Sequence, residues 1–182
     1  MVDGLRSIVY LGGNMDVTNF TQEQMNNLRK IFHSLNHFMV FMWKIGLGKW
    51  INFWPAVIGR IMVIKHRGRK SGKEYLTPVN YAIVDGEIYC MAGFGSISDW
   101  YRNMLVYPRV ELWLPEGKRI ACAEEISDAP DRLSLTGQIA IASGFAAPLL
   151  GINIQKLSDE QLDDISKEYR LVHFTFLEIQ TV

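Results

Sequence analysis

The sequence has little cysteine: its 182 residues include only Cys90 and Cys122. Two cysteines are too few for a disulfide framework, and their spacing matches no zinc-binding or iron–sulfur motif. We therefore expect two reduced thiols in the core, which fits a cytoplasmic protein. His33 and His37 are four residues apart, but no third ligand is near them in the sequence, so we expect no metal site.

The sequence also lacks a long uninterrupted apolar run. The most apolar segment, residues 38–64, is broken by Lys44, Lys49 and Arg60 and by glycine and proline. A membrane-spanning helix needs about 20 consecutive apolar residues, so this segment does not predict one. The first twenty residues do not resemble a secretory signal peptide. The formal net charge is zero, whereas a nucleic-acid-binding domain is usually basic.

Against this neutral background, positive charge is concentrated in one short segment. The stretch from His66 to Tyr81 reads HRGRKSGKEYLTPVNY, and with the preceding residue it carries Lys65, Arg67, Arg69, Lys70 and Lys73. Backbone N–H groups of a glycine-containing turn can converge on an anion, and arginine and lysine can add charge-assisted hydrogen bonds. A strand pattern follows instead of a helix, which excludes a phosphate-binding P-loop. The segment is either an anion-binding turn or a solubilising hairpin tip.

Apolar spacing predicts one long amphipathic helix at residues 22–46, with a capping box of Thr21 and Gln24 at its start. The aromatic stretch from Trp50 to Pro55 predicts a loop that either caps the core or dips into a membrane interface. Later helices are expected within residues 129–150 and from a second capping box, Ser158 with Gln161, to about Tyr169.

Between these helices the pattern changes to strands. We predict strands at Ile61–His66, Glu74–Val84, Glu87–Ala92, Val110–Leu114, Arg119–Ile126 and Leu171–Ile179, with a hairpin turn at Asp85-Gly86. Ser98 is a suitable N-cap for a short helix through Val106. Consecutive hairpins without regular strand–helix alternation predict an α+β fold around a small antiparallel barrel. We expect a single domain (1–182) with an N-terminal helical and aromatic segment (1–54), a barrel core (55–127) and a helical lid with a closing strand (128–182).

An ordered set of motifs then resembles the deazaflavin (F420)-dependent nitroreductase family. The set comprises Gly68-Arg69-Lys70-Ser71-Gly72, Pro78, Asp85-Gly86, Ala92-Gly93-Phe94-Gly95-Ser96, Asp99-Trp100-Tyr101-Arg102-Asn103 and Pro108-Arg109-Val110. The resemblance covers residues 55–127 and implies a split antiparallel β-barrel of the FMN-binding-like kind, with the N-terminal and late helices packed outside it.

The resemblance also implies a binding site for coenzyme F420. Its anionic phosphodiester and glutamate tail would be held by the turn, through Arg69, Lys70 and Ser71. Its flat ring would lie in a slot formed by Thr77, Pro78, Val79, Asn80, Met91, Ala92, Gly93, Phe94, Gly95, Ser96, Trp100 and Asn103. Trp100 and Asn103 are three residues apart on the short helix, so they can face the barrel together. Trp100 is otherwise expected to be an ordinary core aromatic.

The implied activity is hydride transfer between the deazaflavin and a small electron acceptor. The cofactor supplies this chemistry, so we assign no catalytic side chain. Residues 138–151 are apolar and lack the tyrosines that the nitro-reducing members carry near the substrate, which favours an apolar, quinone-like acceptor over a nitroaromatic one. Two alternatives stay open: an FMN-dependent flavin reductase, and a non-enzymatic split-barrel carrier of a fatty acid or other lipid. Peripheral membrane contact through residues 38–54 and a homodimer are also open.

Overall fold

The fold is described from a computed structural model, which covers residues 34–52, 59–93, 95–144, 147, 157–167 and 169–177. The predicted capping box of Thr21 and Gln24 lies outside the described residues, as do Phe94 and the end of the aromatic stretch, Trp54-Pro55.

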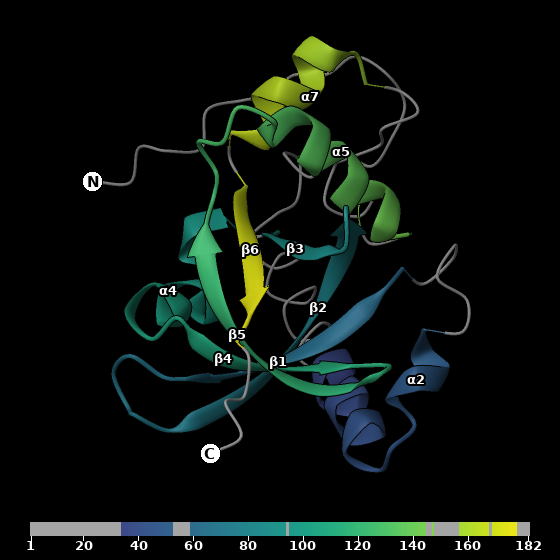
Figure 1. The fold of residues 1–182 in the computed structure, drawn as a ribbon, viewed down its shortest axis with the longest axis vertical. Helices are drawn as coiled ribbons and strands as arrows, with labels where there is room; N and C mark the ends of the chain where they lie inside the picture. Colours follow the sequence, from purple (N-terminus) through teal and green to yellow (C-terminus); the bar gives the residue numbers. More distant parts are fainter. Residues whose placement is uncertain are drawn as a thin grey trace.

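Six strands form a closed barrel in which every neighbouring pair is antiparallel (Figure 1). They are β1 (Ile61–Arg67), β2 (Glu74–Val84), β3 (Glu87–Ala92), β4 (Arg109–Leu114), β5 (Gly117–Glu125) and β6 (Arg170–Phe176). Their order around the barrel is β1-β2-β3-β6-β5-β4, and β4 pairs with β1 to close it. The predicted α+β fold with a small antiparallel barrel is confirmed.

The two central strands have the predicted bounds, because a tight turn fixes their register. Asp85 and Gly86 both have positive φ angles, 51° and 85°, as the favoured two-residue hairpin turn requires. Val84 consequently pairs with Glu87, and Tyr81 with Cys90. The last strand begins at Arg170, one residue before the predicted start.

Alternating residues of each strand fill the barrel. On β1 the inward-facing side chains include Met62 and Ile64, and on β2 they include Tyr81. Cys90 is also fully buried in this core, and burial raises the pKa of its thiol. Cys122 is only half-buried, so the prediction of a core thiol is confirmed for Cys90 but not for Cys122.

Several helix boundaries differ from the predictions. The short helix α2 (Gly48–Ile51) includes Trp50 and Ile51, the first two residues of the stretch Trp50–Pro55 where a loop was expected. Helix α7 (Asp159–Ser166) ends before the predicted Tyr169. Residues 34–44 are helical, within the predicted 22–46. The remaining helical elements are a 3-10 turn at Gly95–Ile97, α4 (Asp99–Val106) and α5 (Arg132–Ala142). Ser98 precedes α4 but its side chain makes no capping hydrogen bond; the hydroxyl is buried without a partner among the described residues.

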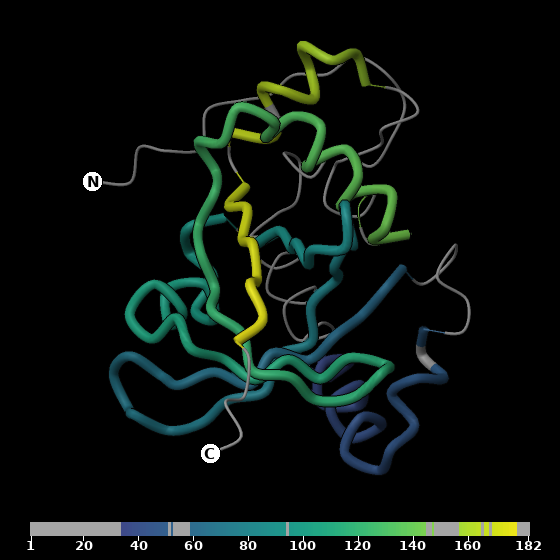
Figure 2. The backbone as a smooth tube through the Cα atoms, in the orientation of Figure 1, coloured from purple at the N-terminus to yellow at the C-terminus, as the bar shows by residue number. Residues whose placement is uncertain are grey.

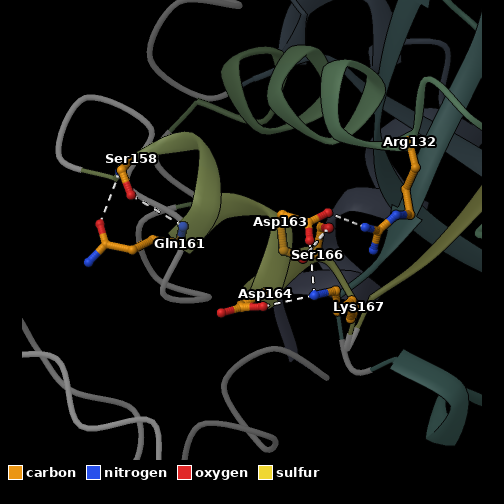
Figure 3. A network of polar contacts seen from close by, with 7 residues as sticks. All are labelled: Arg132, Ser158, Gln161, Asp163, Asp164, Ser166 and Lys167. Atoms are coloured by element: carbon orange, nitrogen blue, oxygen red, sulfur yellow. Dashed lines mark hydrogen bonds and ion pairs between the residues drawn. The ribbon is translucent and has the colours of Figure 1, made fainter.

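The late helices α5 and α7 are joined by polar contacts (Figure 3). Arg132 on α5 forms an ion pair with Asp163 on α7. Lys167, just after α7, contacts Asp163 at 2.9 Å and Asp164 at 2.8 Å. At the start of α7, the N–H of Ser158 donates to the side chain of Gln161 at 3.0 Å, and the N–H of Gln161 donates to Ser158 Oγ at 3.3 Å. The predicted second capping box is confirmed.

The barrel separates two groups of helices. Figures 1 and 2 show α5 and α7 at one end of the molecule, whereas α2 and the helical residues 34–44 lie towards the other end. Helix α4 lies at the side of the barrel. The first helix and α4, rather than the described late helices, are therefore placed to form a site with the β1–β2 hairpin.

Candidate functional site

The cationic turn between β1 and β2 is closed by its own backbone. The N–H of Gly68 donates to the carbonyl of Lys73, and the N–H of Gly72 donates to that of Gly68, each at 2.8 Å. A Cβ added at Gly68 would lie 2.6 Å from the ring of Tyr75 and 2.7 Å from Ser71 Oγ, so a side chain there would require these neighbours to shift. Ser71 Oγ lies 3.0 Å from the hydroxyl of Tyr75. The turn is thus packed tightly onto the first residues of β2.

A cavity of about 860 Å³ lies beside this turn. Three parts of the chain form its walls: the first helix, the β1–β2 hairpin and the start of α4. The lining residues are Asn36, His37, Val40, Lys44, His66, Gly68, Arg69, Lys70, Ser71, Glu74, Tyr75, Leu76, Thr77, Asp99, Trp100 and Asn103. Among the described residues, none of α5 or α7 contributes to this wall. The volume lies within the range of small-molecule and cofactor sites.

Arg69 connects the turn to α4. Its backbone N–H and its Nη1 donate to Asn103 Oδ1 at 3.0 and 2.9 Å, and its Nη2 forms an ion pair with Asp99 Oδ1 at 2.9 Å. The Arg69 side chain is only 20% exposed. Much of its positive charge is therefore already balanced within the protein.

Asn103 also connects Arg69 to the barrel, through His66 on β1. Its Oδ1 accepts from Arg69, so its Nδ2 is the atom that faces His66 Nδ1, at 3.3 Å. An amide nitrogen only donates, which makes Nδ1 of the imidazole the acceptor. The proton of neutral His66 is then on Nε2, which lies 3.0 Å from Thr77 Oγ1. The four side chains form one hydrogen-bonded chain with a defined direction, from Arg69 through Asn103 and His66 to Thr77.

His66 is held neutral by its surroundings. Its side chain is buried, and burial lowers its pKa to about 4, although the nearby Asp99 carboxylate acts in the opposite direction. Tyr75 stacks near the imidazole with ring centroids 5.9 Å apart. Because this pKa lies well below neutrality, the imidazole acts here as a fixed dipole and supplies no charge.

Most cations of the basic segment are engaged elsewhere. Lys65 forms an ion pair with Glu74 at 3.0 Å, which raises the pKa of the lysine, and the guanidinium of Arg67 lies 5.0 Å from the ring centroid of Tyr107. Lys44 and Lys70 line the cavity without an ion-pair partner among the described residues. Among the described residues of the cavity wall, these two lysines therefore carry positive charge that no carboxylate pairs with.

The structure gathers part of the predicted site. Arg69, Lys70, Ser71, Thr77, Trp100 and Asn103 line the cavity together, and Trp100 also packs against the barrel core. Pro78 and Ala92 are buried, and Val79 packs against the barrel core. Met91 packs against two clusters that include buried side chains of α5 and α7. The carbonyl of Ser96 accepts from Arg102, and the side chain of Asn80 donates to the carbonyl of Arg60. Gly93 and Gly95 lie between β3 and α4 and do not line the cavity.

Three contributors were not predicted from the sequence: His66, Asp99 and the first helix. Strand alternation could have found His66, because it continues the inward-facing row of Met62 and Ile64 and is a polar residue in a core position. No comparable signal exists for the first helix, whose residues Asn36, His37, Val40 and Lys44 join the wall through tertiary packing alone.

Comparison with known families identifies the family of this chain. A sequence model described as F420H(2)-dependent quinone reductase matches residues 48–143, more than half of the chain. The chain belongs to this family. The F420H(2)-dependent quinone reductases are oxidoreductases, so the chain is a member of an enzyme family. The matched segment includes the cationic turn, β1 to β5, α4 and all of α5.

Several solved structures are similar to this chain over about two thirds of its length. The conserved hypothetical protein Rv2991 from Mycobacterium tuberculosis has a TM-score of 0.50 and 18% identity, over 65% of this chain and 74% of that one. HutZ, a heme storage protein from Vibrio cholerae, has a TM-score of 0.46 and 12% identity, over 66% and 83%. An FAD-binding protein from Mesorhizobium loti has a TM-score of 0.45 and 16% identity, over 68% and 86%. No curated protein matches the chain.

Proposed function

We propose that this chain binds the deazaflavin F420 in the cavity beside the cationic turn and reduces a quinone with it. The observation that carries the proposal is that Lys70 and Lys44 line the same cavity. The β1–β2 turn, the first helix and α4 meet at this cavity. The family match supports the same cofactor and the same class of acceptor.

The residues present fit such a cofactor. F420 has a flat tricyclic ring and a tail with a phosphodiester and glutamate carboxylates. A cavity of about 860 Å³ is large enough for the ring and part of the tail. The two lysines suit the anionic tail, and Val40, Leu76 and Trp100 offer apolar surface to the ring. When bound, reduced F420 supplies the hydride; the chain binds and orients both partners.

Arg69 has a different role in this proposal from that of Lys70. Its ion pair with Asp99 and its bonds to Asn103 hold the turn against α4. We infer that Lys70 contacts the tail, assisted by Ser71 and the backbone N–H groups of the turn, while Arg69 mainly fixes the turn's position.

Titration of the purified chain with oxidised F420, followed by quenching of cofactor fluorescence, tests the proposal. Saturable F420 binding, together with oxidation of reduced F420 that depends on a soluble short-chain quinone, would support it. Saturable FMN binding without F420 binding would favour a flavin reductase instead. Binding of neither cofactor, with a lipid co-purifying, would favour the lipid carrier.

The first helix suggests where an apolar quinone enters. Its side opposite to the cavity exposes Leu35, Phe38, Phe41 and Ile45, at 47%, 58%, 56% and 50%. Apolar side chains on one side of a helix, with lysines nearby, are typical of segments that lie in a membrane interface. We propose that this surface rests on a lipid bilayer, where long-chain quinones are found. Among the described residues, no helix is long and apolar enough to cross a membrane.

Flotation with lipid vesicles tests this contact. The parent is expected to float with vesicles that contain anionic lipid, and the double variant Phe38→Ser, Phe41→Ser is expected to stay in the soluble fraction. A matched control is Ile83→Ser, which changes another exposed apolar residue on β2, 46% exposed. A parent that does not float at low salt would rule out the contact while leaving F420 binding untouched.

A further inference from the structure

The inward-facing side chains of β1 and β2 change from apolar to polar where these strands reach the cavity. Met62 and Ile64 of β1 lie in the apolar core, and the next inward position is His66. Thr77 lies opposite Ile64 in the strand register and lines the cavity. A polar pair, His66 and Thr77, therefore replaces the apolar core where the barrel meets the cavity.

The hydrogen-bond chain that ends at Thr77 has only one consistent direction. Two Arg69 donors occupy Asn103 Oδ1, which orients the Asn103 amide so that Nδ2 faces His66. The imidazole then accepts at Nδ1 and donates from Nε2 to Thr77 Oγ1. Because that oxygen accepts from His66, its own hydrogen has to point elsewhere.

The hydrogen of the Thr77 hydroxyl has no acceptor in the described part of the chain. The only contact found for this hydroxyl among those residues is with His66, and the side chain is half-buried in the cavity wall. A half-buried donor without an acceptor among the described residues can bond to a ligand, and the fixed tautomer of His66 directs this hydrogen away from the imidazole.

We propose that Thr77 donates a hydrogen bond to a carbonyl oxygen of the molecule bound in the cavity, and that His66 and Asn103 are positioning residues that aim this donor. The proposal rests on the proposed function, which offers two sources of such a carbonyl: the pyrimidine-dione edge of the deazaflavin and the oxygen of the quinone. The hydrogen-bonded side chains from Arg69 to Thr77 cannot supply a proton, since neutral His66 would have to become an imidazolate. Thr77 therefore orients its ligand, and the one proton that the quinone takes up in addition to the hydride comes from the reduced cofactor or from solvent.

The test compares Thr77→Val, which removes the hydroxyl at similar volume, with Thr77→Ser, which keeps it. Thr175→Val is the matched control, at an exposed position of β6. The measurements are the Kd for oxidised F420, the absorption maximum of bound F420, and kcat and KM for a soluble quinone. If the cofactor is the acceptor, Thr77→Val raises the Kd about 3- to 10-fold and shifts the absorption maximum, and Thr77→Ser restores both.

If the quinone is the acceptor, Thr77→Val leaves the F420 Kd and spectrum unchanged and lowers kcat/KM for the quinone by a similar factor. If Thr77→Val keeps the parent's Kd, absorption maximum, kcat and KM, this inference is overturned and the proposed function still stands. A parent that binds no F420 would overturn both this inference and the proposed function.

A second measurement needs no substitution at Thr77. Nitrogen NMR of the unmodified protein with labelled histidine identifies which ring nitrogen of His66 carries the proton, with His66→Gln used to assign the signal. The inference requires the hydrogen on Nε2. A proton on Nδ1 at neutral pH would reverse the direction of the chain and overturn the inference, even if Thr77→Val fails to fold.

Discussion

Asn103 Oδ1 receives two hydrogen bonds from Arg69, one from the backbone N–H at 3.0 Å and one from Nη1 at 2.9 Å. Together with the ion pair between Arg69 and Asp99, this amide holds the cationic turn against α4, although Arg69 and Asn103 are 34 positions apart in the chain. Asn103 is buried, so the contact is shielded from water. The direction of the hydrogen-bond chain through His66 to Thr77 depends on this contact.

We therefore expect Asn103→Ala to destabilise the protein. The change removes the acceptor for two Arg69 donors and the donor to His66, and a buried polar group left unpaired costs about 1–3 kcal/mol. The free energy of unfolding, measured with urea, should fall by about 2–4 kcal/mol. Asn80→Ala is the matched control, because Asn80 makes a single 3.3 Å bond to the carbonyl of Arg60, and it should cost less than about 1 kcal/mol. An equal loss of unfolding free energy in the two variants would show that the Arg69–Asn103 contact stabilises the fold no more than the single Asn80 hydrogen bond does.

The strands could be predicted from the sequence because their signals are local. Alternation and the Asp85-Gly86 turn are sufficient to define β2 and β3. The state of the cationic segment could not be predicted in this way. Whether Arg69 is free depends on Asp99, which approaches it only when α4 docks on the hairpin. Charge clusters read from a sequence show where cations are, but not which of them are already paired.

This distinction gives a prediction for the two lysines of the turn. Lys70 lines the cavity, whereas Lys73 is exposed on the same turn and does not. Lys70→Gln should weaken F420 binding about 5- to 10-fold at low salt, because it removes a charge-assisted bond of about 1 kcal/mol at an exposed site. The loss should shrink as salt is added. Fluorescence titration at two ionic strengths measures both effects.

Lys73→Gln is the control for this comparison, since it lowers the net charge of the turn by the same amount. Its F420 affinity should stay within about twofold of the parent. If both variants lose affinity equally, the tail responds to the overall field of the turn and not to a contact with Lys70.

Two glycines allow a test of how the late helices are attached to the barrel. Gly46 and Gly59 have nearly equal positive φ angles, 81° and 83°. A Cβ on Gly46 would meet nothing within 4 Å, whereas one on Gly59 would lie 2.6 Å from the backbone of Ser143, just after α5. The N–H of Arg60 also donates to the carbonyl of Ala142 at 2.9 Å. The start of β1 is thus in direct backbone contact with the end of α5.

Gly46→Ala should therefore cost only the backbone penalty of a left-handed residue, about 1–2 kcal/mol. Gly59→Ala should cost more than about 3 kcal/mol, because it adds a collision with backbone that cannot rotate away. Thermal unfolding of the two variants, measured in parallel, compares these costs. Similar melting temperatures would contradict the close approach of Gly59 to Ser143.

The last prediction concerns the dependence of stability on pH. Burial lowers the pKa of His66 from 6.5 to about 4 in the folded chain. The charged and titratable groups around it are Asp99 on α4, Arg69 in the turn, and Glu74 and Tyr75 at the start of β2. Between these two pKa values the unfolded chain takes up a proton that the folded chain does not. The free energy of unfolding should therefore fall as the pH is lowered from 6.5 towards 4, by at most about 3 kcal/mol from this residue.

His66→Gln isolates this contribution. Glutamine carries an amide oxygen that can accept from Asn103 and an amide nitrogen that can donate to Thr77, so it imitates the neutral imidazole without titrating. Urea unfolding of parent and variant between pH 7 and pH 5 avoids most of the carboxylate titration, whose unperturbed pKa values lie near 4. The parent should lose stability over this interval and the variant should lose markedly less. Parallel curves for the two proteins would mean that the folded chain accepts a proton on His66 as readily as the unfolded chain, and the imidazole would not be a fixed neutral link between Asn103 and Thr77.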